Sequence, residues 1–404
     1  MTKNLFLTTA IVTASFVANS ALAETITERQ VIESDDTETF TNITANGINS
    51  DGFKGGVIYN EGIFTITGTS NFVNNTAKEG GVIYNNRDEV IDPSDYTNPE
   101  AMSVKIQGAS FTDNKAEYSG GVIFNNKGSM SISNSTLNNN QTGDLMAYGG
   151  AIYNNSHGIM IISDSTINNN LTANSGGAIY NSGTLTITGN SSFSGNKFRN
   201  YDIPELNDIF NVGTLNLITE ENKIIFFASG LNGNGGNDRG TINISGNGKV
   251  HVENELIYHD VNLDSGILEL ASGTSAEATS IIIANGATLK AIGVTFSDQT
   301  SEDDGASISN GGTANISDAE FKKNKVAFEG YSTDYGGAIN NEGGTMTISN
   351  ATFTNNQVVR LDGDGENVDT GTKYGGAISN REYSEMSISG ATFSGNKTIA
   401  YPYA

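Results

Sequence analysis

The tetrapeptide Gly-Gly-(Ala/Val)-Ile recurs along this chain, and its spacing constrains the fold more than any other feature. In six of the seven copies an apolar residue follows 17 or 18 positions after the first Gly, with an Asn three positions further on. A repeat with such a fixed internal register indicates a solenoid. The copies begin at Gly55, Gly80, Gly120, Gly149, Gly176, Gly336 and Gly375.

One repeat unit, Gly176 to Asn196, shows what each copy encodes. Its apolar residues fall in three short runs, Ala178–Asn181, Thr184–Thr188 and Ser192–Ser194, which are separated by Gly, Ser and Asn. Leu and Ile alternate with Thr in the second run, as in a strand with one buried face. The unit therefore predicts three short strands joined by tight turns.

Strands this short cannot bury a core alone, but stacked copies can. If each unit adds one strand to each of three sheets, Ile179, Leu185, Ile187 and Phe193 fall inside a continuous apolar column. We therefore predict an all-β fold, a right-handed parallel β-helix of roughly a dozen turns of 25–30 residues, about 60 Å long. Runs rich in Gly, Asn, Thr and Ser are poor helix formers, which argues against a helical solenoid.

Two files of residues recur at fixed places in the unit. Asn at the end of the first and third strands predicts stacked amides at the corners of the coil. Aromatic residues beside the buried Ile are interpreted as a packing ladder, with a sugar-binding strip as the alternative. The files contain Asn60, Asn85, Asn125, Asn154 and Asn181; Asn75, Asn114, Asn140, Asn170 and Asn196; and Tyr59, Tyr84, Phe124, Tyr153, Tyr180 and Phe210.

The middle of the chain lacks the double Gly but keeps a Gly-x-apolar-x-apolar signature at Gly213, Gly240, Gly266 and Gly286. We interpret these four as second strands of one uninterrupted coil. The expected organisation is a signal peptide at 1–23, a lead-in at 24–50, a first repeat array at 51–200, a continuing coil at 201–303 and a second array at 304–404.

The first residues predict export. A charged start, an apolar run and small residues at Ala21 and Ala23 match a cleavable signal peptide. No later segment approaches the length of an apolar membrane helix. An exported chain without Cys suggests the cell surface, outer membrane or exterior of a Gram-negative bacterium.

The composition excludes several classes of function. The formal charge is −24, from 45 acidic and 21 basic residues, so binding to nucleic acid is not expected. The absence of Cys excludes disulfides, thiolate metal sites and a Cys nucleophile.

The longest insertions all follow the third strand of a unit and precede the next double Gly. We therefore expect them to project from one edge of the rod, where solenoids commonly bind partners. Tyr residues just before the double Gly predict exposed aromatics on that edge, Tyr335 and Tyr374 among them. The insertions are Gln141–Tyr148, Lys197–Leu206, Lys325–Tyr335 and Gln357–Tyr374.

One of these insertions contains a candidate calcium site. Asp362, Asp364, Glu366 and Asp369 supply four carboxylates within eight residues, and carboxylates are the donors that calcium prefers. The spacing is not that of an EF-hand, and a solvated acidic loop is the alternative. No other cofactor is expected.

Catalysis has little support in the sequence. The three His residues are not spaced as metal ligands, and no nucleophile elbow is present. A β-helix polysaccharide lyase or hydrolase remains the alternative, with Asp303 and Asp304 as its nearest carboxylate pair and Ser156-His157 as its only His motif. The expectation is that the protein is not an enzyme.

The pairing of Gly-Gly-Ala-Ile with Phe-x-x-Asn resembles the repeats of chlamydial polymorphic outer membrane proteins over about Gly55–Asn196 and Asp304–Asn396. The resemblance implies an autotransporter passenger that acts as an adhesin. It also implies a C-terminal outer-membrane barrel, which the sequence up to Ala404 does not supply, so we expect a longer gene product.

The resemblance further implies that the two motifs take part in attachment to a host-cell or matrix protein or glycan. A passive surface spacer is the second alternative. The predicted binding residues are Gly176, Gly177, Ala178, Ile179, Phe193 and Asn196; Gly336, Gly337, Ala338, Ile339, Phe353 and Asn356; and the edge residues Tyr335 and Tyr374.

Overall fold

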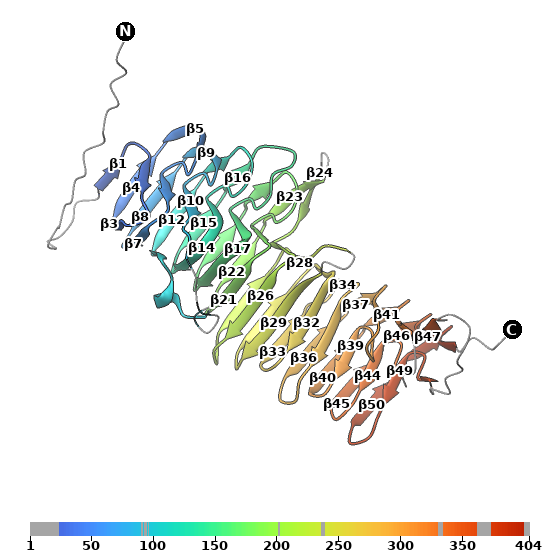
Figure 1. The fold of residues 1–404 in the computed structure, drawn as a ribbon. Helices are drawn as coiled ribbons and strands as arrows, with labels where there is room; N and C mark the ends of the chain where they lie inside the picture. Colours follow the sequence, from blue (N-terminus) through green and yellow to red (C-terminus); the bar gives the residue numbers. More distant parts are fainter. Residues whose placement is uncertain are drawn as a thin grey trace, which may run out of the picture.

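The protein is a parallel β-helix, as predicted, and forms an elongated rod (Figure 1). The computed structural model describes residues 24–89, 92, 95, 97–200, 203–235, 239–329, 334–361 and 373–399. The predicted signal peptide lies outside these ranges. Within them the only helical element given bounds is the 3₁₀ turn η2 (Pro99–Ala101), and every strand pairing but one is parallel.

Three faces surround the core, and each is a stack of strands contributed by successive turns. The first face contains β2 (Gln30–Ile32), β6 (Ile58–Asn60), β10 (Ile83–Asn86), β14 (Ile123–Ser133), β17 (Ile152–Ser163), β20 (Ile179–Asn181), β25 (Ile209–Asn211), β28 (Leu231–Asn232) and β31 (Leu256–Ile257).

The second face begins beside it, and β14 and β17 are long enough to cross both faces. It contains β3 (Thr37–Thr41), β7 (Ile63–Thr67), β11 (Val104–Gln107), β14, β17, β21 (Thr184–Thr188), β26 (Thr214–Thr219), β29 (Gly240–Gly246), β32 (His259–Leu263), β35 (Ser280–Ile283), β39 (Ile308–Asn310), β44 (Ile339–Asn341) and β49 (Ile378–Asn380).

The third face is a 14-stranded sheet that runs the length of the rod. It contains β1 (Glu24–Ile26), β4 (Ile43–Asn46), β8 (Ser70–Val73), β12 (Ala109–Thr112), β15 (Thr136–Asn138), β18 (Thr166–Asn168), β22 (Ser192–Ser194), β27 (Ile224–Phe227), β30 (Lys249–Val252), β33 (Ile267–Leu270), β36 (Thr288–Ile292), β40 (Thr313–Ser317), β45 (Thr345–Ser349) and β50 (Glu385–Ser389).

Repeat units also form a fourth strand, which the sequence analysis did not predict. It follows the Asn that closes the third strand and buries a single small residue, such as Ala116 or Thr142. A strand of two residues has no period-2 pattern to detect. In the first half these strands form β5 (Asn49–Lys54), β9 (Thr76–Glu79), β13 (Lys115–Ala116), β16 (Gln141–Thr142), β19 (Leu171–Thr172) and β23 (Lys197–Asn200), closed by the antiparallel β24 (Ile203–Leu206).

The remaining strands lie in the second half of the rod. A five-stranded sheet contains β34 (Ser275–Glu277), β37 (Thr295–Ser297), β41 (Glu320–Lys322), β46 (Thr352–Thr354) and β51 (Thr392–Ser394). Beside it lie β38 (Thr300–Ser301), β42 (Lys325–Glu329), β47 (Gln357–Leu361) and β52 (Lys397–Ile399), and the pair β43 (Asp334–Tyr335) and β48 (Lys373–Tyr374).

The turns in the middle of the rod are shorter than the predicted 25–30 residues. Lys249 pairs with Ile267 and Gly240 with His259, so these turns advance by only 18 and 19 residues. They have three strands and no fourth. Gly266 and Gly286 introduce β33 and β36, which lie on the third face and continue into β40, a second strand of the second array; Gly213 and Gly240 introduce β26 and β29, which lie on the second face.

These short turns rotate the repeat motif by one face. In the second array, the first strand of each unit (β39, β44, β49) stacks on β35 of the second face, and the second strand (β40, β45, β50) stacks on the third face. The third strand joins the five-stranded sheet. That sheet continues the first face, because β34 meets β31 through the bridge between Glu255 and Ser275.

The insertions consequently project from two edges, and the prediction of one edge was wrong. We call the corner between the third and first faces, with β5 to β24 and the loops that follow them, the N-edge. The corner between the first and second faces in the second array, with β38, β42, β47, β52 and their loops, is the C-edge. The two arrays project their insertions from different edges because the middle turns contain fewer residues. The spacing of the motifs within the arrays carries no information about those middle turns.

The core is a column of aliphatic side chains and stacked Phe rings. Phe321 lies between Phe296 and Phe353 with ring centroids 4.7 Å apart on either side, and all three rings are fully buried. Ile179, Leu185, Ile187 and Phe193 are buried, as predicted. Stacked rings at this separation add to the stability that burial alone supplies.

Candidate functional site

The double Gly moves the chain sharply from the fourth strand into the next first strand. Gly176 and Gly336 have φ of +76° and +66°, in the left-handed region that favours Gly. A Cβ on Gly177 or Gly337 would collide with the carbonyl oxygen of Asn207 or Gly376 in the next turn. Only Gly fits both positions, so the motif has a structural explanation in backbone packing.

The other predicted motif residues lie inside the coil. Side chains inside the coil cannot contact a ligand that binds on the outside of the rod. The fully buried residues are Ala178, Ile179, Phe193 and Asn196 in one repeat, and Ala338, Ile339, Phe353 and Asn356 in another.

The corner Asn residues form the predicted amide ladders. Asn170 Nδ2 donates to Asn196 Oδ1 at 3.0 Å, and Asn356 Nδ2 donates to Asn396 Oδ1 at 2.9 Å. Each amide also bonds to the backbone of a neighbouring turn, as Asn196 Nδ2 does to the carbonyl of Ile167 at 2.8 Å. The ladders satisfy buried polar groups at the corners and fix the spacing of the turns.

The outward aromatic file is a packing ladder, as interpreted from the sequence. The six rings from Tyr59 to Phe210 are stacked with neighbouring centroids 4.6–5.6 Å apart. Arg29 lies 5.1 Å over the Tyr59 ring at one end. The ring faces that a sugar would need are therefore covered by neighbours. Burial, together with Tyr153 and Tyr148, raises the pKa of Tyr180 to about 12.

The N-edge exposes apolar side chains on several of its strands and loops. Leu145 and Met146 are 87% and 77% exposed in the loop after β16, and Ile203 is 71% exposed on β24. Phe53, Tyr118 and Leu206 extend the row. Exposed apolar rows of this kind mark interaction surfaces. Tyr118 belongs to the Tyr residues before a double Gly that the sequence analysis predicted to be exposed. The analysis did not single out Leu145, Met146, Ile203 or Leu206, although they lie in the predicted insertions.

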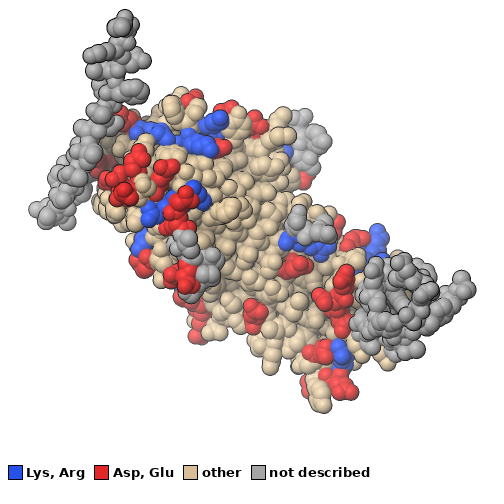
Figure 2. All heavy atoms as spheres, in the orientation of Figure 1, with Lys and Arg blue, Asp and Glu red and all other residues tan. Residues whose placement is uncertain are grey.

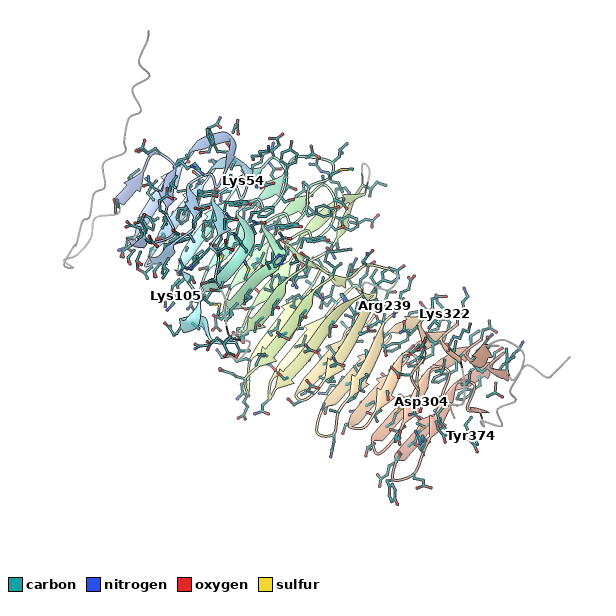
Figure 3. The ribbon with its side chains drawn as sticks, viewed as in Figure 1. Lys54, Lys105, Arg239, Asp304, Lys322 and Tyr374 are labelled. Atoms are coloured by element: carbon teal, nitrogen blue, oxygen red, sulfur yellow. The ribbon has the colours of Figure 1, made fainter. Side chains whose placement is uncertain are left out.

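Basic residues accompany this apolar row. Figure 2 shows Lys and Arg gathered over the part of the rod where Figure 3 labels Lys54, in a protein of net charge −24. Lys54 Nζ lies 2.8 Å from Glu79 and 4.6 Å from the centroid of the Tyr84 ring. Lys78 lies over the Tyr118 ring at 5.5 Å. The N-edge is thus less acidic than the chain average.

The C-edge carries the two predicted Tyr residues. Tyr335 and Tyr374 stack with centroids 5.2 Å apart, and Tyr374 is 47% exposed (Figure 3). Arg381 lies 3.9 Å over the Tyr335 ring, and its Nη1 is 2.6 Å from Glu342 and 3.4 Å from Asp304. Tyr374 is therefore exposed to solvent and stacks on Tyr335, which is held in turn by Arg381 and its two carboxylate partners.

The candidate calcium site cannot be placed. Asp362, Asp364, Glu366 and Asp369 lie outside the described residues. Elsewhere, in the part of the chain that the structure describes, no three His, Asp or Glu side chains are grouped to hold a metal ion.

The residues considered for catalysis do not form a catalytic cleft. Asp304 is engaged by Arg381 and accepts a bond from the Tyr335 amide at 2.9 Å. His157 is exposed, and its Nδ1 lies 3.2 Å from Ser156 Oγ. A depression of about 490 Å³ at the last described turns is lined by Gly375, Ile378, Phe393 and neighbours.

A buried carboxyl group continues one Asn ladder. Asp208 accepts a bond from Asn196 Nδ2 at 2.7 Å and another from the Ser229 amide at 2.7 Å, and it has no exposed surface. Burial raises the pKa of Asp208 to about 7, although these donors oppose the shift. Asp208 is therefore the titratable group that couples the ladder to pH.

We expect the Asp208 contribution to the free energy of unfolding to fall as pH rises. The folded state keeps the proton up to about pH 7, whereas the unfolded chain loses it near pH 3.8, the ordinary pKa of an Asp. The contribution is complete below 3.8 and lost above 7, with a slope of about 1.4 kcal/mol per pH unit between. Urea unfolding of wild type and Asp208→Asn at pH 5, 6 and 7 isolates it. A constant difference between the two proteins would show a carboxylate already ionised at pH 5.

Fold and edges together define a solenoid scaffold whose repeated residues are internal and whose insertions are external. The repeat of the Chlamydia polymorphic membrane protein matches this chain at residues 164–182 and 350–381. Each match contains an apolar-x-x-Asn motif and the double Gly that follows it, and one lies in each array. The chain therefore carries repeats of this family, as the resemblance implied. No curated protein matches the chain.

The described helical structure is too short to cross a membrane: no helix among these residues combines sufficient length with sufficient apolar character.

Proposed function

We propose that this chain is the surface-displayed passenger of an autotransporter-type protein and that it acts as an adhesin. The repeat match supports a surface or outer-membrane location, since the family is one of membrane proteins. Host-cell or matrix proteins or glycans are the proposed partners. Calcium at Asp362–Asp369 remains a proposal for the C-edge.

The observation that carries this proposal is the division between interior and edges. Phe193, Asn196 and their equivalents are fully buried, so their role in attachment is to hold the turns that display the loops. The ligand contacts are then assigned to exposed side chains at the edges, such as Leu145, Met146 and Tyr374. Exposed aromatic and long apolar side chains are typical of binding hot spots.

Binding of the purified chain from Glu24 onward to epithelial cells and to extracellular-matrix proteins tests the proposal. We expect saturable binding, which falls at least several-fold in a Leu145→Ser/Met146→Ser variant or in Tyr374→Ser. Ile282→Ser is the matched control, because Ile282 is 48% exposed on β35, which is not one of the strands and loops that define the two edges.

The outcomes separate the alternatives. Loss of binding in one edge variant alone identifies the edge that is used. Equal binding by the control and the edge variants would contradict the assignment to the edges. The absence of saturable binding by the intact chain would leave a surface spacer or a polysaccharide-cleaving enzyme, which a screen of polysaccharides distinguishes.

A further inference from the structure

The first-face strands are shortest, and form the fewest backbone pairs, in the turns where the repeat motif moves from one face to the next. Here the first face is held by β28 and β31, strands of two residues each, which pair through Leu231 and Leu256. Among the described residues, no named strand pairs with β31 on the side of the next turn. The connections there are the bridge between Glu255 and Ser275, a bond from Thr279 Oγ1 to the Leu256 carbonyl at 2.8 Å and one from the Tyr258 amide to the Glu277 carbonyl at 3.0 Å. Tyr258, with φ of +59°, then turns the chain into β32.

His259 fills the interior of this turn. Its imidazole has no exposed surface, and Nδ1 lies 3.1 Å from the carbonyl oxygen of Gly240 in the turn below. Nδ1 is therefore the protonated nitrogen of the neutral ring. Nε2 is buried and has no hydrogen-bond partner. The ring packs against the backbone of Gly233, where a Cβ would lie 3.0 Å from Cε1.

If His259 took up a second proton, the groups around the ring would supply no negative charge to balance it. The Gly233 side and the Thr279 side, where Thr279 Oγ1 accepts from the His259 amide at 3.4 Å, present neutral groups. Arg239, next to Gly240, has an unfavourable electrostatic effect on a charged imidazole.

The carboxylates of Asp260 and Glu255, close to His259 in the sequence, are engaged elsewhere. Asp260 lies 4.0 Å from Arg239, and Glu255 accepts from Asn232 Nδ2 at 2.9 Å. Glu277 is half-buried in β34, and its backbone carbonyl accepts from Thr279 Oγ1. Burial is the main reason that the pKa of His259 is lowered to about 4. The backbone groups of Gly240 and Asn232 oppose this shift without reversing it. Protonation of the closed turn would still bury a charge that has no counter-charge, which is costly.

We propose that His259 makes the middle of the rod a proton-sensitive joint, in which mild acid opens β28, β31 and the start of β32 while both repeat arrays stay folded. The opened turn exposes the imidazole to water, where it takes up a proton near its ordinary pKa. Opening thus binds one proton, and the equilibrium shifts toward the open turn as pH falls. This inference does not depend on any ligand.

The direction and size of the pH effect on the opening equilibrium follow from proton linkage. An open-state pKa of 6.5 and a closed-state pKa of about 4 leave the opening equilibrium unchanged above pH 6.5. Between these values each unit of acidification favours opening, and at pH 4.5 the opening constant rises on the order of 50-fold. Asp208 acts with the opposite sign and bonds the Ser229 amide, so the comparison of wild type with His259→Gln, in which Asp208 is unchanged, separates the two effects.

Hydrogen exchange of the full chain, read by mass spectrometry as protection factors at pH 7.4 and 4.5, tests the joint. We expect protection in peptides covering residues 229–263 to fall roughly 50-fold, while peptides covering 176–196 and 337–356 keep theirs. His259→Gln cannot take the proton, so its protection there is expected to change little with pH. His251→Gln is the matched control, because His251 is half-buried on β30 and pairs with Glu269 at 2.8 Å.

Two results would overturn the proposal. One is unchanged protection of 229–263 in wild type at pH 4.5, and the other is an equal loss in wild type and His259→Gln. If His259→Gln does not fold, the titration of His259 can be measured directly in the wild-type protein. Of the three His in the chain, one signal in an NMR titration of histidine-labelled wild type should stay neutral down to pH 5, and three signals titrating near 6.5 would refute the joint.

Discussion

Replacing Gly177 with Ala is expected to lower the free energy of unfolding by about 3 kcal/mol. The new Cβ would meet the carbonyl oxygen of Asn207, the amide of Lys197 and the carbonyl carbon of Asn196. All three are backbone atoms of adjoining strands, so no flexible side chain can move aside. The clash is relieved only if two turns separate, which breaks their ladder. Urea unfolding followed by circular dichroism gives the change in midpoint.

Gly343→Ala provides the control for this prediction. Gly343 has φ of +78° and nothing within 4 Å of its Cβ position, so its substitution costs only the strain of a left-handed residue, about 1 kcal/mol. A difference between the two variants then measures the close approach of the turns. Equal losses in Gly177→Ala and Gly343→Ala would show that the turns relax around a methyl group.

Asn154→Ala is expected to cost about 4 kcal/mol, because it interrupts a buried chain of amides. Asn154 Nδ2 donates to Asn181 Oδ1 at 2.8 Å, and Asn125 Nδ2 donates to Asn154 Oδ1 at 2.8 Å. Truncation leaves a donor and an acceptor without partners, at about 1–3 kcal/mol each, and adds a cavity. Hydrogen exchange should show the loss concentrated in the turns on either side.

The neighbouring Asn155 supplies a matched variant on the same strand. Asn155 Nδ2 donates to Asn126 Oδ1 at 3.0 Å, but the side chain is only half-buried and water can replace its partner. Asn155→Ala is therefore expected to cost less than about 1 kcal/mol. Similar losses in both variants would mean that the buried ladder contributes no more than its exposed counterpart.

The fold was predictable because the sequence of each repeat contains the signals for its own strands and turns. Leu185 and Ile187 alternate with Thr, the double Gly requires a close approach of backbones, and the Asn after Phe193 indicates a corner. All of these signals act within one turn. They predicted the core column and the amide ladders, because stacked copies of one turn place equivalent residues above one another.

What the sequence could not predict depends on the number of residues in a turn. A Gly-x-apolar-x-apolar run encodes a strand and its preceding corner, but every face of the coil accepts such a strand. Gly266 and Gly240 therefore look alike, although β33 lies on the third face and β29 on the second. The one-face rotation and the two edges follow from this ambiguity.

The candidate site was predicted in part. Tyr374 is exposed at an edge, as expected, whereas Phe353 and Asn356 are buried inside the coil. A motif that recurs is easily mistaken for a contact surface, because stacking and recognition both favour repetition. Leu145 and Met146 occur once each, in an insertion, and carry no repeated pattern that the sequence analysis could use.

The rotation by one face has a consequence for how such genes diversify. Unequal recombination within one array adds or removes whole turns and leaves every loop on its original side of the rod. Joining the first array directly to the second in motif register would delete the short middle turns and align the C-edge with the N-edge. Gain or loss of that central stretch, about 100 codons in the division at 201–303, would therefore re-aim half of the displayed surface without altering any residue that it presents.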